Sequence, residues 1–185
     1  IYTLPQYRRP DDTVSILDNK TALDIESFDQ QLWGGVVTKP DLWGAIGEIS
    51  YYGFAERDNP KRPTRNRNLH NFDLRYFRIP SSEQFDFEGE GIYQTGVARS
   101  SLAAVAPELD VSAWFLHFDA GYTFSGEMKP RLSFEYDYVS GGTGPDNYTH
   151  FDTLLGMRRA DFAPGGIYAQ IGRANINTPG VRLEF

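Results

Sequence analysis

The chain has 185 residues, enough for one domain with its own core, and its 18 Lys and Arg against 25 Asp and Glu give a net charge of -7. This negative balance argues against a general affinity for nucleic acid. Because the chain has no cysteine, disulfides and thiolate metal sites are excluded, and its three histidines lie far apart in sequence. We therefore expect one domain over residues 1–185, with no cofactor, no metal site and no nucleic-acid partner.

Segments that alternate between apolar and polar residues recur along the chain, which is typical of β-strands whose two faces meet different surroundings. After an opening half-strand, the pattern predicts strands at 32–38, 43–55, 69–79, 84–99, 111–124, 130–140 and 180–185. Short turns are expected at 39–41, 80–83 and 125–129, and long loops at 5–28, 56–68, 100–110 and 141–179. Because the chain opens on the end of a strand, we expect it to be a fragment of a longer protein.

The segment 130–140 shows the alternation most clearly, with Leu132, Phe134, Tyr136 and Tyr138 on one side. In a soluble sheet this apolar side would face a core, whereas in a transmembrane barrel it would face lipid. Long connections alternate with short ones along the chain, as in outer-membrane barrels, and several predicted strands have about 11 to 16 residues, long enough to span a membrane. We therefore predict an all-β fold, an antiparallel up-and-down transmembrane β-barrel. A soluble antiparallel barrel or sandwich is the alternative.

The charged side of these strands is the candidate site. In a barrel it would face a wet lumen, since the desolvation of unpaired charges would be prohibitive. Arg75, Arg131 and Arg182 on this side could attract an anion, or could be solvated counter-ions to the acidic residues. The acidic residues predicted to line the pore are Asp73, Asp86, Glu88, Glu90, Asp119, Glu135, Asp137 and Glu184.

Three further arginines, Arg158, Arg159 and Arg173, fall in the long loop 141–179. Folded over or into the pore, they could pair with the carboxylates of an acidic sugar chain, because the planar guanidinium fork suits carboxylates. The alternative is that they pair with acidic wall residues and fasten the loop.

Catalytic sites are disfavoured by the same pattern. The acidic row at 86–90 could be mistaken for a glycosidase carboxylate pair, and His117, Asp119 and Ser133 for a catalytic triad. Polar residues that share the water-facing side of neighbouring strands would give the same sequence pattern as these catalytic groups. We therefore expect that the protein is not an enzyme.

Three aromatic residues, Trp33, Trp43 and Tyr122, lie near the predicted short turns. They indicate an aromatic girdle at a membrane interface. Packing in a soluble core is the alternative.

The last part of the chain, residues 150–185, reads HFDTLLGMRRADFAPGGIYAQIGRANINTPGVRLEF. It resembles the C-terminal segment of the alginate-export family of bacterial outer-membrane channels, in which an FDTL-F-G-RR-F-G core precedes GIYG and a PG-R strand. Ala169 replaces a common Gly of that pattern. The segments 39–45 and 131–141 are similar to less specific parts of the family.

The resemblance implies a bacterial outer-membrane location and a larger barrel of about 18 strands around a charged pore, of which this truncated C-terminal portion would hold roughly eight. It implies a channel that passes an anionic polysaccharide such as alginate, or related acidic sugars. The implied partners are outer-membrane lipid, the acidic polysaccharide and periplasmic export components. A general or small-solute uptake porin is the alternative role, and a soluble antiparallel β binding domain is a further one.

Overall fold

A computed structural model describes residues 29–58, 63–142, 144, 147–154 and 175–185. Their regular structure is all β. Within these residues there is no helix with the length and apolar character needed to cross a membrane.

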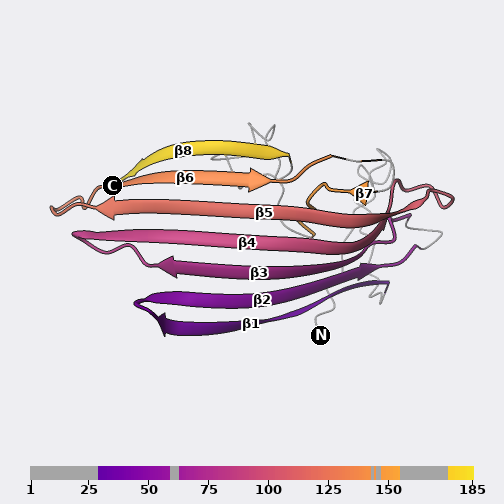
Figure 1. Ribbon diagram of the computed structural model, residues 1–185, viewed down its shortest axis with the longest axis horizontal. Coiled ribbons are helices and arrows are strands. Elements are labelled where there is room, and N and C mark those ends of the chain that lie inside the picture. Colours follow the sequence, from indigo (N-terminus) through magenta and orange to yellow (C-terminus); the bar gives the residue numbers. More distant parts are fainter. Residues whose placement is uncertain (1–28, 59–62, 143, 145–146, 155–174) are drawn as a thin grey trace, which may run out of the picture.

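The strands form one sheet in which neighbours along the chain are neighbours in space, in the order β1-β2-β3-β4-β5-β6-β8, and each of these pairs is antiparallel (Figure 1). The short β7 pairs with β5 in parallel. Over the described residues β1 and β8 are the two edge strands and do not pair with each other. The sheet is therefore open, as expected for one part of a larger barrel. The bounds are β1 Gln30–Leu42, β2 Ala45–Glu56, β3 Asn68–Arg78, β4 Gln84–Arg99, β5 Glu108–Thr123, β6 Arg131–Val139, β7 Asn147–Tyr148 and β8 Ile176–Glu184.

The all-β, antiparallel, up-and-down prediction is confirmed, but the first turn is not where the sequence placed it. β1 continues through 39–41 to Leu42, and the turn consists of Trp43 and Gly44. Both have positive φ, 51° and 81°, as a two-residue type I′ hairpin requires. Pro40 indicated a turn, but an edge strand tolerates proline, and the pairing is irregular there between Lys39 and Leu42.

The last strand also begins earlier than the alternation predicted. β8 starts at Ile176 and includes Pro179, again on an edge strand. The predicted opening half-strand and the whole of the first long loop, 5–28, lie outside the described residues.

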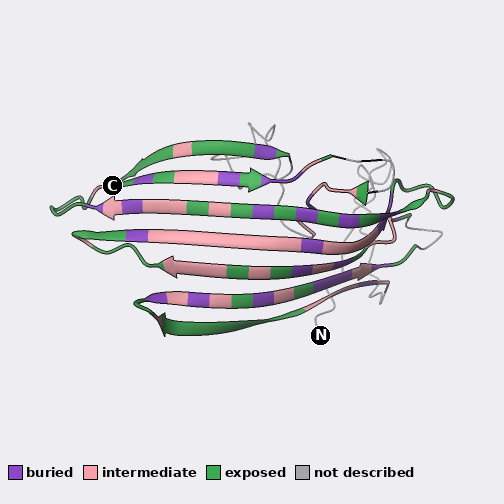
Figure 2. Ribbon diagram, viewed as in Figure 1, coloured by how far each residue is buried: buried purple, intermediate pink, exposed green. Residues whose placement is uncertain are grey.

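The two faces of the sheet differ in chemistry. The apolar side chains are the exposed ones and the charged side chains are buried, which is the reverse of a soluble protein. On β6, Leu132 and Phe134 are each 46% exposed, whereas Arg131, Ser133 and Asp137 are buried. Figure 2 shows the same alternation of exposed and buried residues along β5. We call the exposed side the apolar face; it carries Ile49, Phe72, Leu74, Phe85, Trp114, Leu116, Phe118, Leu132, Phe134, Val181 and Leu183.

The opposite side, the polar face, carries the ionisable residues of the strands. Its buried apolar residues gather near the end of the sheet at which β2, β4 and β6 end and β3, β5 and β8 begin, which we call the long-loop end. Phe151 belongs to one of these clusters, together with Phe115 and Val139, and Tyr148 and Leu154 pack against the other. Part of the long connection after β6 therefore folds back onto the polar face.

Aromatic side chains form two groups on the apolar face. Toward the long-loop end, six residues into β5, the rings of Tyr93 and Trp114 lie 4.5 Å apart. At the other end, the short-turn end with the connections 43–44, 79–83 and 124–130, the rings of Phe85 and Tyr122 lie 4.8 Å apart. Further ring contacts join Trp33 to His70, Tyr51 to Phe72, Tyr76 to Phe87 and Tyr122 to Phe124.

Of the three predicted girdle residues, Trp43 and Tyr122 lie at the short-turn end, but Trp33 does not. Trp33 pairs with Gly53 and lies at the long-loop end, because β1 runs on past the predicted turn to Leu42.

Candidate functional site

Arg131 is the most heavily paired cation of the polar face. Its guanidinium donates to Asp86, with Nε 3.0 Å from Oδ1, and also to Asp119 and to Glu184, the last at 3.2 Å. The residue is 9% exposed and lies directly over Gly121, whose missing side chain leaves room for the guanidinium. Arg131 therefore joins β4, β5, β6 and β8 across the sheet.

Arg75 has the same role between β2 and β4. Its Nε donates to Glu88 at 2.7 Å and its Nη1 to Glu48 at 3.3 Å, while the guanidinium lies 4.2 Å from the centre of the Phe77 ring. One third of the side chain remains exposed.

Arg182 and His117 bind the carboxylates of β6. Arg182 donates to Glu135 at 2.7 Å, and the ring nitrogen Nδ1 of His117 lies 2.8 Å from Asp137. Ligand atoms of His117, Glu135 and Asp137 lie within 4.8 Å of one another, close enough to approach a metal ion. Each carboxylate already accepts a hydrogen bond, which accounts for their positions.

Carboxylates clearly outnumber guanidinium groups on the described polar face. Asp73 accepts a hydrogen bond from Ser50 at 2.7 Å, and its other oxygen is buried without a hydrogen-bond partner among the described residues. The described strand arginines of this face are Arg75, Arg131 and Arg182; its strand carboxylates are Glu48, Glu56, Asp73, Asp86, Glu88, Glu90, Asp119, Glu135, Asp137 and Glu184.

Residues 147–154, which we call the inner segment, are bound to the polar face through Gln94. The fully buried Gln94 amide accepts from the backbone N–H of Asp152 and donates to its carbonyl, both at 2.8 Å. It also donates to Asn71 at 2.7 Å. This pairing satisfies backbone groups that would otherwise be buried without partners.

Charged residues at the long-loop end hold the same segment. Arg67 donates to Glu56 at 2.8 and 2.9 Å and to Asp152 at 2.6 Å. Burial alone would lower the pKa of Arg67, but hydrogen bonds to Glu56 and the attraction of Asp152 raise it overall. The guanidinium therefore stays charged and keeps the β2–β3 connection attached to the inner segment.

A second contact orders the β2–β3 connection nearby. The backbone N–H of Thr64 and the Arg99 side chain donate to Asp58, and together they lower the pKa of that carboxyl. Arg65 donates to Tyr148 at 3.0 Å and lies over its ring.

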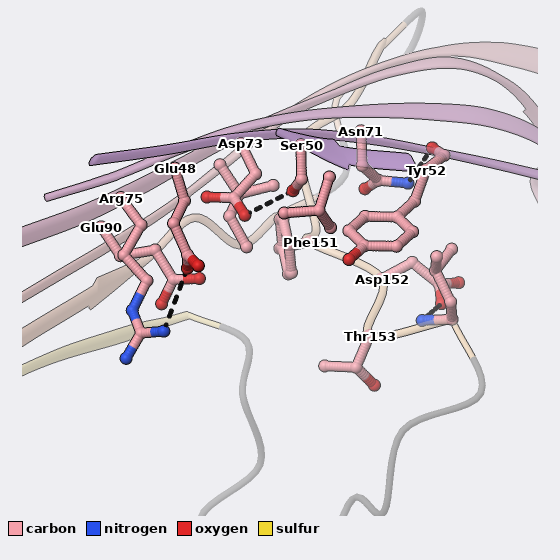
Figure 3. Close-up of a pocket in the computed structure, with 13 residues that line it drawn as sticks. Glu48, Ser50, Tyr52, Asn71, Asp73, Arg75, Glu90, Phe151, Asp152 and Thr153 are labelled. Atoms are coloured by element: carbon pink, nitrogen blue, oxygen red, sulfur yellow. Dashed lines mark hydrogen bonds and ion pairs between the residues drawn. The ribbon is translucent and has the colours of Figure 1, made fainter. Parts of the chain in front are cut away.

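The inner segment and the polar face of β1 to β4 enclose a pocket of about 470 Å³. Figure 3 shows Asp152 and Thr153 on one side of it and Glu48, Asp73 and Tyr52 on the sheet side. The lining combines carboxylates, Arg75, amide and hydroxyl groups with the rings of Tyr52 and Phe151.

The family model described as Alginate export matches residues 14–185, nearly the whole chain. The chain belongs to the alginate export family. This is a family of transport proteins rather than of enzymes. Neither the curated proteins nor the solved structures contain a match to this chain.

The predicted site residues of this family member fall into two sets. Arg158, Arg159 and Arg173 lie outside the described residues. All the other predicted residues lie on the polar face, brought together by the strand register: Arg75, Arg131, Arg182, Asp73, Asp86, Glu88, Glu90, Asp119, Glu135, Asp137 and Glu184.

Sequence reasoning missed the attachment of the inner segment. Gln94 continues the polar alternation of β4 and so could be assigned to this face, but its partner Asp152 lies 58 residues away. No local pattern relates the two. The sequence prediction also left out Glu48, for a different reason: apolar residues on both sides of β2 blur its alternation.

Proposed function

We propose that the chain forms part of the wall of a bacterial outer-membrane channel that passes an anionic polysaccharide such as alginate, or related acidic sugars. One observation carries the proposal: the sheet exposes its large apolar side chains and buries its charges in ion pairs. A transmembrane barrel needs this arrangement because lipid surrounds it and water fills it. The alginate export family supplies the class of cargo.

The spacing of the aromatic groups supports a membrane location. Trp114 and Tyr122 mark the two groups on β5, and at about 3.3 Å per residue they lie about 26 Å apart along the strand. A tilt of about 40° reduces this to about 20 Å, close to the apolar band of about 25 Å between the girdles of outer-membrane barrels. Outer-membrane lipid would cover the apolar face, and periplasmic export components would meet the short-turn end.

The arginines of the polar face would differ in their access to a solute. The side chain of Arg182 is 53% exposed and that of Arg75 is 33% exposed, so both retain donors for a passing uronate. Arg131 is 9% exposed and would act on the polymer mainly by charge. Arg158, Arg159 and Arg173 would add carboxylate-binding forks from the long connection after β6.

The test is single-channel recording of the full-length protein in planar bilayers. Uronate oligomers should block the current, and Arg182→Gln should weaken the blockade severalfold because an exposed carboxylate-binding fork is lost. Arg78→Gln, which removes the same charge from the apolar side of β3, serves as the matched control. Conductance without blockade by uronates would contradict the polysaccharide role.

The excess of carboxylates favours a second candidate, an uptake porin for small solutes. An acidic wall attracts cations and repels a polyanion. Cation preference together with the absence of uronate blockade would favour this role over polysaccharide export.

A further inference from the structure

The pocket between the inner segment and the sheet carries an excess of negative charge. Among the described residues that line it, the charged ones are four carboxylates and one arginine: Glu48, Asp73, Glu90, Asp152 and Arg75. Arg67, which is not part of this lining, binds Asp152 at 2.6 Å, so that carboxylate is already neutralised. The charges of the other three carboxylates must be matched by Arg75 or by a ligand.

Arg75 does not match all of them. Its Nε donates to Glu88, outside the pocket lining, at 2.7 Å, and its Nη1 donates to Glu48 at 3.3 Å. These two carboxylates more than balance the single charge of the guanidinium. Asp73 and Glu90 are therefore the uncompensated anions of the pocket.

Asp73 and Glu90 also have acceptor positions to spare. One oxygen of Asp73 accepts from Ser50 at 2.7 Å, and the other is buried without a hydrogen-bond partner among the described residues. Glu90 forms no hydrogen bond and no ion pair with the described part of the chain. Because an unpaired acceptor shielded from water is unfavourable, the pocket favours a ligand that donates hydrogen bonds and carries positive charge.

The spacing of these two carboxylates suits a cation larger than a metal ion. β3 and β4 pair Arg75 with Glu90 and Asp73 with Ile92, so Asp73 and Glu90 are diagonal neighbours with Cα atoms about 7–8 Å apart. A metal ion needs its ligand atoms about 2.0–2.6 Å away. Among the described residues, three ligand atoms come within 4.8 Å of one another elsewhere on the polar face, at His117, Glu135 and Asp137.

The rest of the lining suits the hydrocarbon part of an organic cation. The ring of Tyr52, a residue that is 38% exposed, projects from β2 into the pocket (Figure 3). Ile92, Phe151 and Leu154 add apolar surface. An aromatic ring face attracts an ammonium group and also packs against an alkyl chain. The volume of about 470 Å³ lies within the usual range of small-molecule sites.

We propose that this pocket binds a small organic cation, a solute with ammonium groups on a short hydrocarbon chain. Its ammonium groups donate to Asp73 and Glu90, and its chain packs against Tyr52 and Phe151. A uronate would meet like charges at both carboxylates and is disfavoured. The inference goes beyond the polysaccharide role and does not depend on it.

Isothermal titration of the full-length protein in detergent micelles with 1,4-diaminobutane tests the site. The diamine should bind saturably, and Glu90→Gln should weaken its binding about tenfold because a charge-assisted hydrogen bond is lost. Glu135→Gln makes the same change on the polar face outside the pocket lining, and it should bind like the wild type. No binding by the wild type, or equal weakening in the two variants, would overturn the site.

Two further measurements separate the occupants. The uncharged 1,4-butanediol has the same chain length and should not bind; binding as tight as that of the diamine would overturn the requirement for a cation. Diamine binding that appears only after Arg158→Gln with Arg159→Gln would assign the pocket to the chain's own arginines and would also overturn the proposal. None of these measurements uses an ionic current, so a protein that does not conduct would contradict the proposed channel and not this site.

Discussion

At the scale of single residues, Gly121 and Arg131 depend on each other. A side-chain carbon at Gly121 would lie 2.6 Å from an Arg131 nitrogen, so Gly121→Ala should displace the guanidinium from Asp86 and Asp119. We expect a loss of about 1–3 kcal/mol in the free energy of unfolding, as for other overpacked sites. Urea unfolding in lipid vesicles measures it. Gly89→Ala is the control, because nothing lies within 4 Å there, and an equal loss in both variants would contradict the explanation.

Arg131 and Arg182 should differ in what they contribute to stability. The Arg131 side chain is 11% exposed and that of Arg182 is 53% exposed. Arg131→Gln leaves buried carboxylates without their cation and should destabilise by about 3–5 kcal/mol. Arg182→Gln should change the unfolding free energy by about 0–1 kcal/mol, because solvent screens the pair. Similar unfolding midpoints for the two variants would show that the buried ion pairs of Arg131 do not contribute more to stability than the exposed pair of Arg182.

At the scale of elements, β5 provides a test of which side faces lipid. Leu116 in β5 and Leu102 in the connection 100–107 have similar exposure, 44% and 56%. If both residues faced water, arginine should be tolerated at either position. If the apolar face lies in a bilayer, Leu116→Arg should lower the free energy of unfolding by about 2–4 kcal/mol and Leu102→Arg should lower it much less. Unfolding of both variants from lipid vesicles gives the comparison. Equal stability would show that the apolar face is not immersed in lipid.

At the scale of the whole molecule, the proposed channel predicts that the balance of charge on the polar face governs which ions enter. Glu90 forms no ion pair with the described arginines, so it adds to the negative potential of the polar face. We expect Glu90→Gln to shift the reversal potential in a salt gradient toward anions. The shift should fade near 1 M salt, where the Debye length is about 3 Å. Glu127→Gln in the exposed connection 124–130 is the control; an equal shift there would assign the effect to overall charge.

Much of the sheet could be predicted from the sequence, because the alternation of apolar and polar side chains along a strand is a local pattern. Along 131–139 each side chain points opposite to its neighbour, so parity alone assigns Phe134 to one face and Asp137 to the other. The first turn was misplaced because Pro40 and Asp41 are ordinary turn residues. The edge position that lets Pro40 remain within β1 depends on which strands pair.

The sequence by itself determined the strands, their two faces and the family, since alternation and motifs are properties of neighbouring residues. Only the tertiary structure decided that Arg131 is buried among carboxylates on the polar face and that the inner segment folds back onto that face. The reason is the distance along the chain: Arg131 meets Asp86 over 45 residues and Gln94 meets Asp152 over 58. Such contacts form only after the strands have paired, and no local pattern encodes them.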